Sequence, residues 1–349
     1  MGEDSIGKAV RAYQEAMAEL KRHPRRYELT PKFMTDHLLR TVGGMEKLKA
    51  LAGAPTRTAA EEEKLVKQFH AICSRKEQIQ GFFRHTLDLE DLFKRAGNPP
   101  SLKLIAQPDT HVKFMHRPAM NALLRFGRWH APHVWLILGD FADCEGVAHW
   151  EPNSREPRRI VPEMKIARDL LAEINAATPT VSTRIFLEGN HENWIEQALN
   201  RMPELFEGLD DLDLGINVKK LLALEKFGYN FFPLNHLVQI GKAHFTHGSF
   251  TQQHHAKKHL DTYKGNIYYG HLHDIQSHNQ TSLEGHMEGA SLGCLCRLDA
   301  HFLKGKPNNW VHAFGIFEFF PDGTYTFVRP TIFDGKFSFA GVVFDGNLK

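Results

Sequence analysis

The sequence predicts an α/β fold for residues 101–349, preceded by a helical region over residues 1–97. Short apolar runs alternate with helical patterns after residue 101, whereas apolar residues recur every three or four positions before residue 97. Asn98-Pro99-Pro100 separates the two patterns and is typical of a domain boundary. The 349 residues can accommodate one domain of roughly 250 residues and an accessory region.

The accessory region, residues 1–97, is expected to consist of several helices. Its first apolar stripe consists of Ile6, Val10, Tyr13, Met17 and Leu20. A capping-box pattern, Thr58-Ala-Ala-Glu61, precedes a second and longer stripe. The region carries more Lys and Arg than Asp and Glu, so two roles stay open: docking of DNA through a helix pair around Gly43-Gly44, or simple packing and oligomerisation.

After residue 101 each apolar run is short enough for a strand. The expected strands are residues 102–106, 134–138, 184–187, 238–240, 243–246 and 267–269. Helices are expected at residues 118–129 and from Pro162 onward. Beyond about residue 285 the pattern is all-β, with hairpin turns expected at Asp322-Gly323 and Asp334-Gly335.

Composition narrows the class of protein. No run of about 18 apolar residues occurs, so no membrane span is expected, and the opening residues MGEDSIGKAV lack the apolar core of a secretory signal. Four cysteines without paired C-x-x-C spacing indicate reduced thiols and a cytoplasmic location. A net charge of +2 permits a nucleic-acid partner without arguing for one.

The chain contains 22 histidines, and several of them lie in short polar motifs that follow the predicted strands. In chain order the motifs are Asp109-Thr-His111, Gly139-Asp140-Phe-Ala-Asp143, Gly189-Asn190-His191-Glu192, His247-Gly248 and Gly270-His271-Leu-His273. Loops at the carboxyl ends of strands converge on one crevice of an α/β sheet. These five motifs are therefore expected to form one site.

The donor types in these motifs predict the metal chemistry. Carboxylates, imidazoles and an amide form a mixed nitrogen and oxygen shell, which suits Mn, Fe, Ni or Zn better than Mg or Ca alone. The supply of donors exceeds one tetrahedral zinc and fits two divalent metal ions that share a carboxylate. Two metals about 3.5–4 Å apart are the arrangement that serves in-line phosphoryl displacement.

The ordered motifs D-x-H, G-D-x-x-D, G-N-H-E, H-G and G-H-x-H resemble the signature of the calcineurin-like metallophosphoesterase superfamily, over roughly residues 101–330. The resemblance implies a double β-sandwich flanked by helices. It also implies that Asp109, His111 and His273 hold one metal, that Asn190, His247 and His271 hold the other, and that Asp140 bridges them. A water activated between the metals would attack phosphorus, and His191 would protonate the leaving oxygen with Asp143 orienting it. Asn190 would also touch the phosphate.

Three substrate hypotheses remain open at the level of sequence. A phosphodiesterase acting on DNA is favoured by the mildly basic residues 1–97 and by the segment 254–259, from which His254 and Lys257 are candidate phosphate contacts. A phosphomonoesterase is the alternative, because G-N-H-E is the form seen in Ser/Thr protein phosphatases. Those enzymes carry Arg after the second Asp to clamp phosphate, and here Cys144 stands there. A non-catalytic, DNA-docking metal protein is the third, and the complete ligand set argues against it.

Overall fold

The computed structural model describes residues 83–148, 159–201, 216–283, 285–299 and 305–348. Internal packing divides the chain into two units, Met1–Gly81 and Phe82–Lys349, and every described residue belongs to the second. The helices and the DNA-docking role predicted for residues 1–82 lie outside the described residues.

One six-stranded sheet has the order β12-β11-β2-β3-β4-β5. Its strands are β2 (Leu102–Gln107), β3 (Val134–Ile137), β4 (Thr183–Leu187), β5 (Tyr229–Phe232), β11 (Gly315–Phe319) and β12 (Tyr325–Val328). Strands β2 to β5 are parallel, and β11 and β12 add an antiparallel edge. The parallel strands carry continuous apolar runs because both of their faces are covered.

The second six-stranded sheet has the order β1-β6-β7-β8-β10-β9. Its strands are β1 (Arg84–Thr86), β6 (Leu237–Ile240), β7 (Ala243–Thr246), β8 (Asn266–Tyr269), β9 (Ser277–Ser282) and β10 (Gly285–Ser291). The two sheets pack face to face through one apolar core, in which Leu104, Leu136 and Ile185 of the first sheet join Val238 and Phe245 of the second. The predicted double β-sandwich is confirmed.

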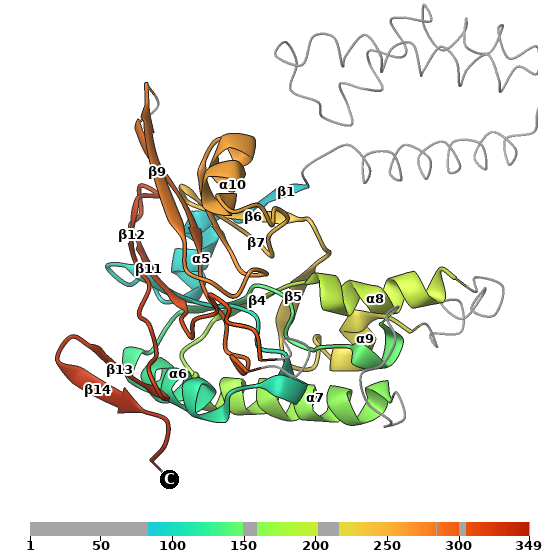
Figure 1. The fold of residues 1–349 in the computed structure, drawn as a ribbon. Coiled ribbons are helices and arrows are strands. Elements are labelled where there is room, and N and C mark those ends of the chain that lie inside the picture. Colours follow the sequence, from blue (N-terminus) through green and yellow to red (C-terminus); the bar gives the residue numbers. More distant parts are fainter. Residues whose placement is uncertain (1–82, 149–158, 202–215, 284, 300–304, 349) are drawn as a thin grey trace, which may run out of the picture. The chain divides into compact units, whose positions relative to one another are not determined.

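Helices cover the outer faces of the sandwich (Figure 1). Those against the first sheet are α6 (Arg117–His130), α7 (Ile160–Ala177), α8 (Asn190–Leu199) and α9 (Val218–Leu222). Helix α10 (His255–Tyr263) packs Leu260 on Ile267 and Tyr269 of the second sheet. Two short 3-10 turns, Val112–Phe114 and Glu145–Val147, follow β2 and β3. Within the described residues, no helix combines the length and apolarity that a membrane crossing requires.

The boundary between the two units differs from the one expected at residues 98–100. Strand β1 pairs in parallel with β6, with Arg84 opposite Leu237. Helix α5 (Leu89–Arg95) is capped by Asp88, whose carboxylate accepts from the Glu90 amide at 3.0 Å, and it buries Leu92 and Phe93 in the core between the sheets. Residues 83–97 therefore belong to the sandwich, because they supply a strand and a core-forming helix to it.

The chain ends in a small antiparallel pair, β13 (Lys336–Phe339) and β14 (Val342–Asp345), which packs against α6. Asp322-Gly323 makes the predicted turn between β11 and β12. Asp334-Gly335 also makes a two-residue turn, with Phe333 and Lys336 exchanging backbone hydrogen bonds across it. The turn between β13 and β14 is instead at Ala340-Gly341, where both residues have positive φ.

Candidate metal centre and active site

The loop after β2 carries Asp109 and His111 and is fastened to the loop after β3. The amides of Thr110 and His111 both donate to the carbonyl of Asp140, at 3.0 and 2.9 Å. The Asp109 carboxylate is fully buried and accepts from the amide of His271 at 2.8 Å. These backbone bonds fix the first, second and fifth motifs relative to one another.

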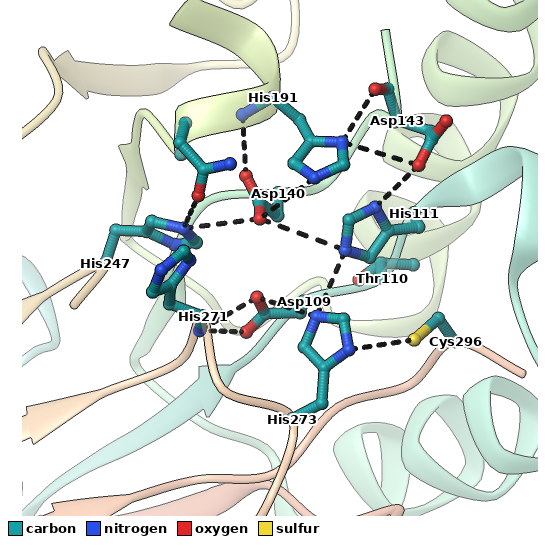
Figure 2. A network of polar contacts seen from close by, with 12 residues as sticks. Asp109, Thr110, His111, Asp140, Asp143, His191, His247, His271, His273 and Cys296 are labelled. Atoms are coloured by element: carbon teal, nitrogen blue, oxygen red, sulfur yellow. Dashed lines mark hydrogen bonds and ion pairs between the residues drawn. The ribbon is translucent and has the colours of Figure 1, made fainter. Parts of the chain in front are cut away.

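Asp140 occupies the centre of the site, and side chains from four motifs surround it (Figure 2). Its Oδ1 accepts from the amide of His191 at 3.0 Å, which is one of the free donors in the first turn of α8. Its Oδ2 lies 3.3 Å from His247 Nε2 and 3.9 Å from Nε2 of both His111 and His191. One carboxylate thus faces imidazoles from both halves of the site.

Two groups of ligand-type side chains share this carboxylate. The first consists of Asp109, His111, Asp140 and His273, and the second of Asp140, His247 and His271; within each group one donor atom per residue lies within 4.8 Å of the others. Asn190 adjoins the second group, with its Oδ1 2.9 Å from His247 Nε2. The structure therefore brings together all seven residues predicted as metal ligands, and their division between two metals stays a prediction.

The residues present fit two divalent metal ions. In the first group, His111 Nε2 and His273 Nε2 face each other at 3.2 Å, and Asp109 Oδ1 lies 3.3 Å from the same His273 nitrogen. In the second group, His271 Nδ1 is buried without a hydrogen-bond partner among the described residues. Nitrogen and oxygen donors that converge in this way satisfy a cation better than they satisfy one another.

Backbone strain is concentrated at the same residues. His111, Asp140, His271 and His273 all have φ between 43° and 68°, in the left-handed region that non-glycine residues rarely adopt. Such strain persists where the surrounding structure imposes it, and it gathers at functional sites. The strained loops point their side chains at the centre of the site. Relaxed loops would direct the same side chains elsewhere.

Two glycines permit the carboxylates to approach the neighbouring loops. A Cβ on Gly270 would lie 2.1 Å from Asp109 Oδ2, and a Cβ on Gly189 would lie 2.1 Å from Asp140 Oδ1. No side chain fits at either position while the carboxylates stay in place. The glycines beside the predicted ligands are therefore part of the site's geometry.

The carboxylate and the imidazoles at the centre of the site stabilise each other's charged forms. Although burial raises the pKa of the Asp140 carboxyl, the neighbouring His247 and His191 hold it well below its usual range. Burial lowers the pKa of His247, but Asp140 outweighs it and raises that pKa to about 9. Metal ions bind neutral imidazole and carboxylate, so binding would displace such protons from the site.

The family model described as calcineurin-like phosphoesterase matches residues 102–290, which is more than half of the chain. The chain belongs to the calcineurin-like phosphoesterase family. Members of this family are generally hydrolytic phosphoesterases and typically bind two divalent metals. The matched residues include all five motifs and both ligand groups.

Two solved structures are similar to this chain at low sequence identity. A single mutant of Vps29 from Entamoeba histolytica is 12% identical, with 66% of this chain and 100% of that chain covered and a TM-score of 0.30. The protein TT1561 of Thermus thermophilus is 8% identical, with 66% of this chain and 99% of that chain covered and a TM-score of 0.27. A comparison with curated proteins gave no match.

His191, the predicted general acid, lies at the edge of the two ligand groups and is partly exposed. Its Nδ1–H donates to the backbone carbonyl of Asp143 at 2.8 Å, which turns Nε2 towards the centre of the site. Burial disfavours the imidazolium, but Asp140 and Asp143 raise the pKa of His191 to about 10. Trp194 packs on the ring, with ring centroids 4.0 Å apart.

Asp143 contacts two histidines. Its Oδ1 lies 3.1 Å from His111 Nδ1 and 3.4 Å from His191 Nδ1. The carboxylate thus orients the metal-ligand candidate His111 at least as directly as it orients His191, whose closer partner is the main-chain carbonyl. The predicted orienting role of Asp143 is accordingly divided between the two rings.

Two buried glutamates accept hydrogen bonds from backbone amides of the Asp140–Cys144 loop. Glu192 accepts from the amides of Gly189, Asp140 and Ala142 at 2.8–3.0 Å. Glu163, on α7, accepts from the amides of Asp143 and Cys144. Burial raises the pKa of Glu192 to about 8 and that of Glu163 to about 7. The motif around Glu192 is typical of a helix cap, whereas Glu163 has no sequence signal beyond its place in a helix.

The thiol of Cys296 also lies beside the first ligand group. Cys296 Sγ lies 3.7 Å from His273 Nδ1, on the side of the ring away from Asp109 (Figure 2). The sequence pattern predicts no more for the cysteines than that they are reduced thiols. This free thiol also forms a further group of ligand-type side chains with His111 and His273.

The two residues predicted to contact substrate phosphate lie outside the ligand groups. His254 and Lys257 are exposed at the start of α10, and the ammonium of Lys257 pairs with Asp261 one turn along the helix. Their role in substrate binding stays a prediction. The neighbouring His255 and His259 are buried.

Proposed function

We propose that this protein hydrolyses phosphodiesters with two divalent metal ions, manganese foremost, and that nucleic acid, DNA in the first place, is its substrate. The observation that carries the proposal is the placement of Asp140 between two groups of ligand-type side chains. A shared carboxylate between two such groups is the arrangement that in-line phosphoryl displacement uses.

The residue that stands in the arginine position of the Ser/Thr phosphatases favours a diester over a monoester. A phosphate monoester carries about 1.5–2 negative charges near neutral pH and is usually clamped by arginine. A diester carries a single charge. The arginine position of the Ser/Thr phosphatases is filled here by Cys144, which is buried.

The metals, His191 and Asn190 have different roles in the proposed hydrolysis. The bound metals would activate a water and offset the charge on phosphorus. His191 donates a proton from Nε2 to the leaving oxygen, because Nδ1 is already occupied by the Asp143 carbonyl. Asn190, at the first position of α8, directs its amide towards His247 and the same region, where it would meet a phosphoryl oxygen.

The test is a parallel assay of the purified protein with Mn²⁺ on three substrates: end-labelled DNA, a bis-nitrophenyl diester and a nitrophenyl monoester. We expect cleavage of DNA and of the diester, with the monoester turned over at least about tenfold more slowly. Added EDTA should stop both reactions, because the donors alone activate no water. Turnover of the monoester alone would place the protein among the phosphatases instead.

A further inference from the structure

Helix α10 lies against the two loops that carry His247, His271 and His273. Two of its histidines, His255 and His259, are 2% and 0% exposed, and neither belongs to a ligand group. Buried imidazoles are retained where both ring nitrogens find partners. Three of the four partners of these ring nitrogens adjoin the ligand loops, and the fourth is the carbonyl of His255 on the helix itself.

His255 connects both ends of the loop 270–273. Its Nε2 lies 3.0 Å from Asp274 Oδ2, and its Nδ1 lies 2.8 Å from the hydroxyl of Tyr269. A carboxylate only accepts, so Nε2 carries the proton and Nδ1 accepts from Tyr269. Tyr269 is the residue before this loop and Asp274 is the residue after it. One ring therefore clamps the loop at entry and exit.

His259 connects the helix to the loop that follows β7. Its Nδ1–H donates to the carbonyl of His255 at 2.8 Å, and its Nε2 accepts from the amide of Ser249 at 3.1 Å. Ser249 stands two residues after His247. The ring also stacks on Tyr269, with centroids 3.7 Å apart and planes at 14°. The same helix thus restrains the loops of His247 and of His271.

Asp274, which His255 contacts at one end of the clamp, is also hydrogen-bonded to the second sheet. Asp274 Oδ1 accepts from the hydroxyl of Ser291, at the end of β10, at 3.0 Å. The same hydroxyl accepts from the amide of Gln276 at 2.8 Å. Asp274 is therefore fixed from the strand side while His255 holds it from the helix side.

A restraint of this kind is needed, because the loop is strained. His271 and His273 have φ of 68° and 61°, a conformation that non-glycine residues keep only where the surrounding structure imposes it. Without contacts at both ends, the loop would relax and turn the two imidazoles away from their ligand groups.

We propose that His255 and His259 are positioning residues that set the metal affinity of the centre from outside it. His255 acts on both ligand groups, because its loop supplies His273 to the first and His271 to the second. His259 acts chiefly on the second group, through Ser249 and the loop of His247, and its stacking on Tyr269 supports the clamp of His255. The inference rests on the two-metal centre of the proposed function.

The test compares Mn²⁺ binding by the full chain in wild type, His255→Ala and His259→Ala, by titration of the metal-depleted protein and elemental analysis after gel filtration. Loss of residues that orient metal ligands costs about 10–100-fold in metal affinity. We expect a weakening of that size at both sites in His255→Ala and at one site in His259→Ala. Electron paramagnetic resonance should show the coupled dinuclear signal of wild type replaced by an isolated-ion signal in His259→Ala.

Three further variants separate positioning from folding. Lys258→Ala, which removes an exposed side chain on the same helix, should bind both metals as wild type does. His255→Gln, which can keep a donor towards Asp274, should recover part of the affinity. Tyr269→Phe removes one hydroxyl from the clamp and gives the same readout if His255→Ala fails to fold.

Two results would overturn the proposal. Wild-type affinities in folded His255→Ala and Tyr269→Phe would refute the clamp alone and leave the two-metal centre standing. A wild-type protein that binds no metal would refute the proposed function, and the clamp with it.

Discussion

Asp140→Asn is expected to reduce hydrolysis of the diester by about 10³-fold or more. A metal ion that stabilises charge in the transition state lowers the activation free energy by several kcal/mol. Each 1.4 kcal/mol of activation free energy corresponds to about tenfold in rate. The variant keeps the shape of the side chain, and its oxygen can still accept from the His191 amide, so the fold should persist. What it loses is the charge that faces both ligand groups. The measurement is kcat at saturating Mn²⁺ together with metal content.

The control for this substitution is Asp299→Asn. Asp299 is exposed, and among the residues that the structure describes it pairs with its neighbour Arg297, so its loss should leave rate and metal content unchanged. If Asp140→Asn turned over the diester at a near-normal rate, Asp140 would not be the shared ligand and the division of the site into two groups would be wrong.

His191→Ala is expected to lower the rate by about 10²–10⁴-fold on substrates with a poor leaving group, such as DNA. On the nitrophenyl diester the loss should be much smaller, because nitrophenolate leaves without being protonated. The metals should stay bound, since His191 belongs to neither of the two groups that share Asp140, although it forms a further group of ligand-type side chains with His111 and Asp143. The comparison of the two substrates therefore isolates proton donation from metal binding.

The matched control is His286→Ala, which removes an exposed imidazole on β10 and should change neither rate. Equal losses on DNA and on the nitrophenyl diester would contradict the assignment of His191 as general acid. A loss of metal in His191→Ala would point instead to a structural role at the site.

The clustering of these side chains could be predicted because each motif follows a strand that is recognisable by itself. Residues 134–138 and 184–187 are continuous apolar runs, and they form β3 and β4 in the parallel sheet. Once parallel strands are placed, their carboxyl ends must meet, and Asp140 and Asn190 come together by topology alone. The sequence pattern therefore contains most of the information for the centre.

The place of residues 83–97 in the sandwich could not be predicted from the sequence pattern, for a physical reason. Strand β1 has three residues, too few to show a strand period, and its partner Leu237 lies about 150 positions away. Helix α5 has an ordinary amphipathic pattern, which says that Leu92 and Phe93 are buried but not in which core. The Asn98-Pro99-Pro100 segment marks a turn inside the domain.

The supports of the site could not be predicted from the chain because their partners are distant in sequence. Glu163 reaches the amides of Asp143 and Cys144 only after α7 packs beside the β3 loop. In sequence His255 resembles a substrate-binding candidate next to His254, and only burial against Tyr269 and Asp274 distinguishes the two. Periodicity identifies strands and helices, but it does not identify such contacts.

The most direct test of the two-metal centre is anomalous diffraction from crystals grown with Mn²⁺. We expect two peaks about 3.5–4 Å apart on either side of the Asp140 carboxylate. One peak should be ligated by Asp109, His111 and His273, and the other by Asn190, His247 and His271. A single peak, or two peaks with Asp140 bound to neither, would contradict the account.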